Sequence, residues 1–170
     1  MPNMPTTLHT PTLHPLTAAR EQFRNRLSGA ATQMRCELVA TINGVNYYND
    51  ACANTIDATY NTLTNLGNTI IWILGPYSAL NDYSIFNQLV KNKVACIITF
   101  GDTKNSIVEF FKFQQHTIVT AANLTEATAY ALLYATTGQE VVFSPATNYY
   151  PHYVSQQAMS EEYTNALTTN

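Results

Sequence analysis

The chain has 170 residues, which fits one domain that buries about 70% of its unfolded surface in a single core. Charged residues make up only 11%, against a usual value of about 25%, so Asn, Thr, Gln and Tyr must cover much of the surface. The formal net charge is -3 and the basic residues form no stripe, which argues against nucleic acid or an anionic membrane as the main partner.

The N-terminal region is interrupted by prolines and contains no apolar stretch typical of a secretory signal. We therefore predict a flexible linker over residues 1–16 and one domain over residues 17–170, which opens with a helix from Thr17 to about Ser28. The cysteines are three in number, and their spacing is not that of a zinc site. Reduced thiols in the cytoplasm are the simplest interpretation of Cys36, Cys52 and Cys96.

The central element is expected at residues 69–74, an apolar run without alternation that ends at Gly75-Pro76. Such a run is typical of a strand covered on both faces, in the middle of a parallel sheet. Two earlier β-rich runs flank Asn43-Gly44, a strong hairpin signal. Strands are predicted at residues 36–42, 45–48, 69–74, 94–100, 117–120 and 140–143.

Helical periodicity follows most of these strands. The predicted helices have inward residues Ile56, Tyr60 and Leu63; Ile85, Phe86, Leu89 and Val90; Ile107, Val108, Phe110 and Phe111; and Leu124, Ala127, Ala131 and Tyr134. Strands alternating with helices predict an α/β fold, a three-layer sandwich with a mainly parallel, Rossmann-like sheet and an N-terminal antiparallel hairpin at the sheet edge.

Loops that follow the carboxyl ends of parallel strands meet at one edge, where α/β proteins bind ligands. We expect a shared crevice at Asn49-Asp50, Gly75-Pro76-Tyr77, Gly101-Asp102 and Ser144-Pro145. There is no glycine-rich phosphate loop, and neither His116 nor His152 has a visible carboxylate or cysteine partner in sequence. No catalytic residue and no metal ligand is predicted.

Seven segments carry a family resemblance through their order along the chain: residues 34–37, 39–45, 48–50, 73–75, 82–84, 99–101 and 143–146. They resemble the C-terminal domain of the Mur ligases, most closely of the D-glutamate-adding members, and the resemblance runs from about residue 16 to residue 163.

This resemblance implies an ATP- and Mg-dependent family in which one domain binds the UDP-sugar, a central domain holds ATP in a P-loop, and a third supplies the amino-acid site. Only the third is present, so this chain alone is expected to hold no cofactor, and its partners are the missing domains or an interacting protein.

Two residues match family positions that face the nucleotide, which implies nucleotide contacts for Arg35 and Asp50. The fork of donors of a guanidinium suits phosphate. From the residues alone, an ordinary surface arginine and a turn aspartate remain alternatives.

Other positions depart from the family pattern. Cys52 and Ala79 replace lysines, and Asn54 replaces a threonine. Cys52 is open to interpretation as a reactive thiol or an inert core residue. Ser144 is retained, but Tyr149 replaces a substrate-binding serine and Tyr153 a phenylalanine, with Tyr150 beside them. These tyrosines suit stacking on a ring or roofing the sheet edge.

Removing a dicarboxylic amino acid from water requires cations or several donors, so these changes predict loss of D-glutamate binding. Three functions remain open: the third domain of an ATP-dependent ligase, inactive in isolation; a non-catalytic binding or interaction module; and part of a ligase with altered amino-acid specificity.

Overall fold

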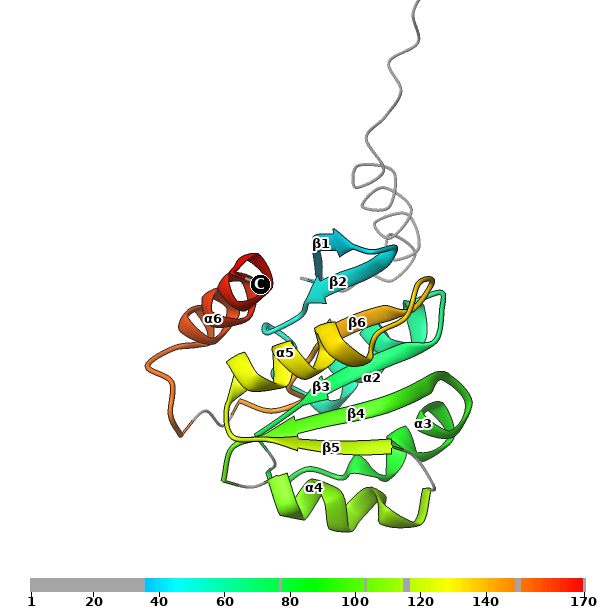
Figure 1. Cartoon of the computed structure of the whole chain (residues 1–170). Coiled ribbons are helices and arrows are strands. Elements are labelled where there is room, and N and C mark those ends of the chain that lie inside the picture. Colours follow the sequence, from blue (N-terminus) through cyan, green and yellow to red (C-terminus); the bar gives the residue numbers. More distant parts are fainter. Residues whose placement is uncertain (1–35, 77, 103, 115–116, 149–150, 170) are drawn as a thin grey trace, which may run out of the picture.

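The computed structural model describes residues 36–169, apart from 77, 103, 115, 116, 149 and 150 (Figure 1). In this part a six-stranded sheet has the order β1-β2-β6-β3-β4-β5. Only β1 and β2 pair antiparallel, and they form one edge of the sheet, which confirms the predicted hairpin and the mainly parallel arrangement. The linker and the helix predicted before residue 36 lie outside the described residues. The strands are β1 (Glu37–Ile42), β2 (Val45–Asn49), β3 (Ile70–Leu74), β4 (Val94–Phe100), β5 (Thr117–Ala121) and β6 (Glu140–Phe143).

Helices cover both faces of the sheet, so the three-layer α/β fold is confirmed (Figure 1). Residues of α2, α3 and α4 share one apolar cluster with one face of the strands, and residues of α5 and α6 share a second cluster with the other face. The helices are α2 (Ile56–Asn65), α3 (Asn87–Lys93), α4 (Lys104–Phe111), α5 (Leu124–Tyr134) and α6 (Gln156–Thr168), with short 3-10 turns η1 (Tyr83–Phe86) and η2 (Lys112–Gln114).

Strand β3 joins the two clusters at the centre of the sheet. All five of its residues are buried, Ile70, Trp72 and Leu74 toward the first cluster and Ile71 and Ile73 toward the second. It pairs in parallel with β4 on one side and β6 on the other. The absence of alternation in its sequence follows from this position, because both faces of the strand require apolar side chains.

Strand β6 lies between β2 and β3, and it begins at the buried carboxylate Glu140. Glu140 Oε2 accepts hydrogen bonds from the amides of Gly67 at 2.8 Å and Asn68 at 3.1 Å, just after α2. At the other end of the strand, the amide of Asp50 donates to the carbonyl of Phe143 at 2.8 Å. The insertion of β6 therefore brings the segments after β2 and after β6 together.

The hairpin turn places both Asn43 and Gly44 at positive φ, 51° and 76°. A side chain at Gly44 would lie 2.8 Å from Thr137 Cγ2. We expect Gly44→Ala to lower the free energy of unfolding by about 2 kcal/mol, because the left-handed backbone and the contact both oppose it. Urea denaturation of the full chain measures the change.

The matched control is Gly138→Ala. Gly138 also has a positive φ, 88°, but open space where a Cβ would lie, so it bears only the backbone cost of about 1 kcal/mol. Equal losses in the free energy of unfolding at both positions would show that the Thr137 side chain moves aside at no measurable cost.

The structure differs from the sequence-based expectations in three places. Helix α6 was not predicted, although Ser155 caps it and Met159, Tyr163 and Leu167 are buried along it. Ile85 and Tyr134, expected inward, are 43% and 49% exposed. The helix expected after Asp82 begins as the 3-10 turn η1, and this tighter winding turns Ile85 outward while Phe86 is buried.

None of the described helices has the length and apolar character needed to cross a membrane.

Candidate functional site

The carboxyl ends of the parallel strands meet at one edge, as the sequence predicts. Ser144 Oγ, directly after β6, donates to Asp50 Oδ2, directly after β2, at 2.8 Å. These residues are 94 positions apart in the sequence, and the parallel pairing of β2 with β6 brings them together.

Asp50 lies inside a polar network rather than at the surface, since only 3% of it is exposed. Ser144 Oγ also lies 2.8 Å from Thr59 Oγ1 of α2, and both residues are fully buried. Burial raises the pKa of the Asp50 carboxyl to about 7, while hydrogen bonds from Ser144 and Thr62 act to lower it. The domain itself therefore supplies the hydrogen-bond donors to this carboxylate, and a nucleotide contact by Asp50 stays a prediction.

Helix α6 is attached to the last residue of β2 and to the segment that follows it. Asn49 Nδ2 donates to Ser160 Oγ at 2.9 Å and to Thr164 Oγ1 at 3.1 Å, and Gln156 Nε2 donates to the carbonyl of Ala51 at 2.7 Å. These side-chain contacts hold the C-terminal segment against the same edge of the sheet.

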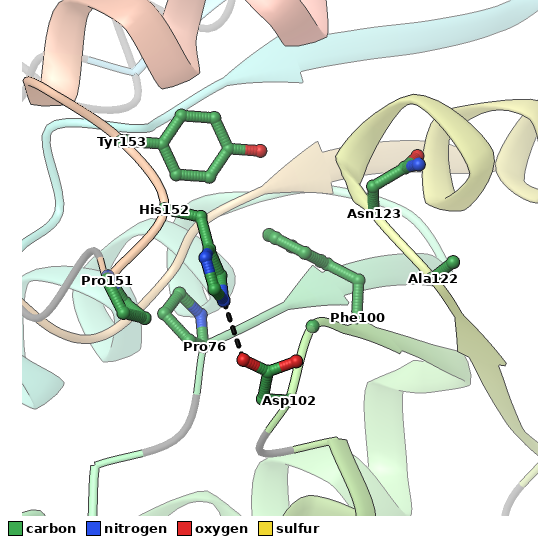
Figure 2. Close-up of a pocket in the computed structure, with 9 residues that line it drawn as sticks. Pro76, Phe100, Asp102, Ala122, Asn123, Pro151, His152 and Tyr153 are labelled. Carbon is green, nitrogen blue, oxygen red and sulfur yellow. Dashed lines mark hydrogen bonds and ion pairs between the residues drawn. The ribbon is translucent and has the colours of Figure 1, made fainter.

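A cavity of about 320 Å³ opens at this edge, between the ends of β3, β4 and β5 and the segment after β6 (Figure 2). His152 Nε2 lies 2.7 Å from Asp102 Oδ2 across its mouth. The expectation that His152 lacks a carboxylate partner is thus wrong, because folding places together two residues 50 positions apart. The cavity is lined by Pro76, Phe100, Gly101, Asp102, Ala122, Asn123, Pro151, His152 and Tyr153.

The N-terminus of α5 borders the cavity, and three amide groups at or just before it have side-chain acceptors. The amide of Ala122 donates to Glu126 Oε2 at 2.6 Å, and the amide of Glu126 donates to Asn123 Oδ1 at 2.8 Å. The amide of Thr125 donates to Glu162 Oε1 of α6 at 3.1 Å. Free N–H groups at a helix start attract anions, so these bonds reduce that attraction.

Carboxylates outnumber cations around the cavity. Burial, together with the nearby carboxylate of Glu162, raises the pKa of the Tyr153 hydroxyl above its ordinary value. None of the described lining residues is Lys or Arg. Lys104 is outside the lining, and its Nζ donates to the carbonyl of Ala121 at 3.3 Å. The site as described therefore suits neutral or positively charged groups.

The residues singled out in the sequence fall into three groups. Asp50 and Ser144 share the buried network, and Tyr153 lines the cavity. Cys52 is half-buried, whereas Asn54 and Ala79 are exposed on the loops after β2 and β3. Arg35, Tyr149 and Tyr150 lie outside the described residues. Their roles stay predictions.

Sequence reasoning missed the contributions of Phe100, Asn123 and His152 to the cavity. The only signal for them was their position next to strand ends or in the altered C-terminal loop. Across the described ranges, no group of three or more His, Cys, Asp or Glu side chains is arranged to hold a metal ion.

The comparison that decides the family is the match of residues 34–147 to the model of the Mur ligase, glutamate ligase domain. The chain belongs to this Mur ligase family. The predicted resemblance to the C-terminal domain of these enzymes, nearest to the D-glutamate ligases, is confirmed.

Curated relatives of this Mur ligase domain include UDP-N-acetylmuramoylalanine--D-glutamate ligases. That of Chlorobaculum tepidum is 35% identical over 129 residues, which is 75% of this chain and 28% of the relative. That of Pelodictyon phaeoclathratiforme is 37% identical over 111 residues, 65% of this chain and 24% of the relative. The domain therefore spans less than a third of the length of these relatives.

Solved structures support the same fold at much lower identity. The murein peptide ligase of Psychrobacter arcticus aligns with a TM-score of 0.54 and 16% identity, over 84% of this chain and 31% of that one. A UDP-N-acetylmuramoyl-L-alanyl-D-glutamate--2,6-diaminopimelate ligase aligns with a TM-score of 0.51 and 15% identity, over 82% and 32%. At this identity the likeness concerns the fold alone.

Proposed function

We propose that the chain acts as the C-terminal domain of an ATP-dependent ligase of the Mur type, that it does not ligate in isolation, and that it does not bind D-glutamate. The match of residues 34–147 to the Mur ligase, glutamate ligase domain supports the domain assignment, and the charge around the cavity carries the proposed loss of D-glutamate binding. Asp102 lies at the mouth, Glu126 and Glu162 hold the amides at the start of α5, and no described lysine or arginine lines the walls. Two further carboxylates there would lack partners, which is costly.

Nucleotide binding is proposed to require other domains. The enclosed Asp50 carboxylate already accepts a hydrogen bond from Ser144, so it is not presented to ATP in this arrangement. Arg35 remains the proposed phosphate contact by family resemblance. ATP and Mg would be held mainly by a nucleotide-binding domain, as the family resemblance implies, and the chain would supply one wall of a shared site.

The partner is proposed to cover the carboxyl edge of the sheet. Leu80, in the loop after β3, is 97% exposed, and Val154, in the segment after β6, is 99% exposed. Large apolar side chains open to water suit contact with another domain or protein. This exposure equally favours the second candidate, a non-catalytic interaction module. The cytoplasm is the proposed location of either, since the free thiols of Cys36, Cys52 and Cys96 fit a reducing compartment.

Calorimetric titration of the full chain with Mg-ATP and with D-glutamate, each alone, is expected to give no saturable heat. The full-length Chlorobaculum tepidum D-glutamate ligase in the same buffer is the control that the assay detects binding. Tight D-glutamate binding by this chain would overturn the charge argument.

The gene separates the two candidates. A reading frame that continues upstream of Met1 into a P-loop would favour the ligase domain, whereas a stop codon just before Met1 would favour the interaction module.

A further inference from the structure

We infer that the cavity at the carboxyl edge binds a small organic amine: a positively charged nitrogen on a flat, apolar body, without a second carboxylate. This deepens the proposed function and rests on it, because that function places the amino-acid side of a ligase at this edge. The residues that line the cavity come from four separate segments of the chain, which the fold brings together (Figure 2).

The walls of the cavity are mostly apolar. Phe100 extends into the space between the strand ends and the C-terminal segment, with Pro76 and Pro151 on one side and the Tyr153 ring on another (Figure 2). A volume of about 320 Å³ lies at the lower end of the range for small-molecule sites, roughly 300–1,000 Å³. The shape and lining therefore suit one ring with a short chain rather than a nucleotide.

The carboxylate of Asp102 at the mouth favours a positively charged group on the ligand. Asp102 is exposed and bonds His152 through Oδ2 alone, so within the described part of the chain its Oδ1 has no donor. An ammonium group donating to Oδ1 would form a charge-assisted hydrogen bond. The Nζ of Lys104 donates to the carbonyl of Ala121 instead.

The same site is unfavourable for an anionic ligand. Three amides at or just before the start of α5, those of Ala122, Thr125 and Glu126, are already bonded to side-chain oxygens. A carboxylate in the mouth would lie near Asp102 without a described lysine or arginine on the lining. Among the described residues, His152 occupies Oδ2 of Asp102 and leaves Oδ1 open, so charge complementarity favours a cation over an anion at this oxygen.

The test uses phenethylamine and 3-phenylpropionate, two probes with the same ring and opposite charge, together with D-glutamate. Each is titrated into the full ¹⁵N-labelled chain and followed by amide NMR shifts. Asp102→Asn removes the proposed partner of the ammonium, and the fold should tolerate it because 80% of the Asp102 side chain is exposed. Glu109→Gln, an exposed carboxylate on α4 paired with Lys112, is the matched control.

We expect phenethylamine to give saturable shifts at Gly101, Asp102 and Asn123. Asp102→Asn should weaken this binding about tenfold, whereas Glu109→Gln should leave it unchanged. No saturation with phenethylamine, equal binding of 3-phenylpropionate, or unchanged affinity in Asp102→Asn would each overturn the inference.

The same experiment separates this inference from the proposed function. If neither amine nor D-glutamate binds, the amine site is wrong and the proposed function stands. If D-glutamate binds, the proposed function itself fails.

Discussion

Replacing Trp72 with alanine is expected to lower the free energy of unfolding by about 3–5 kcal/mol, as is usual for large aromatic side chains in a packed core. Trp72 is fully buried in the central strand β3. Its ring centroid lies 4.8 Å from that of Phe86 and 6.3 Å from that of Phe111. Alanine would leave a cavity between the sheet and its helices, where neighbouring side chains relax only partly.

The indole of Trp72 also has a polar role. Its Nε1 donates to the carbonyl of Ser144 at 2.9 Å, which fixes the segment that carries the Asp50 network. Trp72→Phe keeps most of the packing but removes this donor, so we expect it to cost about 1–3 kcal/mol. The phenylalanine variant also keeps the test valid if the alanine variant does not fold.

Urea denaturation followed by far-UV circular dichroism measures both variants. Fluorescence does not serve, because Trp72 is the single tryptophan of the chain. A loss below about 1 kcal/mol for alanine would contradict the central position of this residue.

The second large effect is a pH dependence set by Asp50. Burial raises its pKa from 3.8 to about 7, so the folded state holds a proton that the unfolded state has already released between these values. Stability contributed by this group is therefore greatest near pH 4, falls as the pH rises to about 7, and is level above it. The full difference is at most about 4 kcal/mol, from 1.36 kcal/mol per pKa unit.

Exposed carboxyls whose pKa is lowered change the stability with pH in the opposite direction, and they do so over a lower pH range than Asp50. Hydrogen bonds donated by Ser84 lower the pKa of the Asp82 carboxyl, and the hydrogen bond donated by the amide of Ala122 lowers that of Glu126. Their stabilisation is present above the unfolded pKa and is lost as the pH falls through the folded one. The decline due to Asp50 is therefore best measured between about pH 4.5 and pH 8, above these titrations.

Asp50→Asn is the variant that isolates the effect, because an amide cannot ionise and its oxygen can still accept from Ser144. We expect the urea midpoint of the wild-type chain to fall between pH 4.5 and pH 7 and that of the variant to stay nearly level, with the pH range set by the pKa of about 7. Parallel curves for the two proteins would show that Asp50 does not carry the dependence.

Local patterns in the sequence predict the six strands, most of the helices and the family. The unbroken apolar run of β3, the run 94–100 and the run 140–143 were enough to predict three strands, because burial on both faces requires continuous apolar residues. Asn43-Gly44 was enough to predict the hairpin, since few other pairs adopt positive φ at both positions. The colinear segments were enough to predict the Mur ligase relationship.

Which residues meet at the candidate site depends on the tertiary structure and cannot be read from local sequence. The hydrogen bond from Ser144 to Asp50, the pairing of His152 with Asp102, and the docking of α6 through Asn49 all join residues at least 50 positions apart. Local sequence records periodicity and turns, but it does not record which strand lies between which others. The insertion of β6 between β2 and β3 sets those neighbours, and with them the burial and charge of every group at the edge.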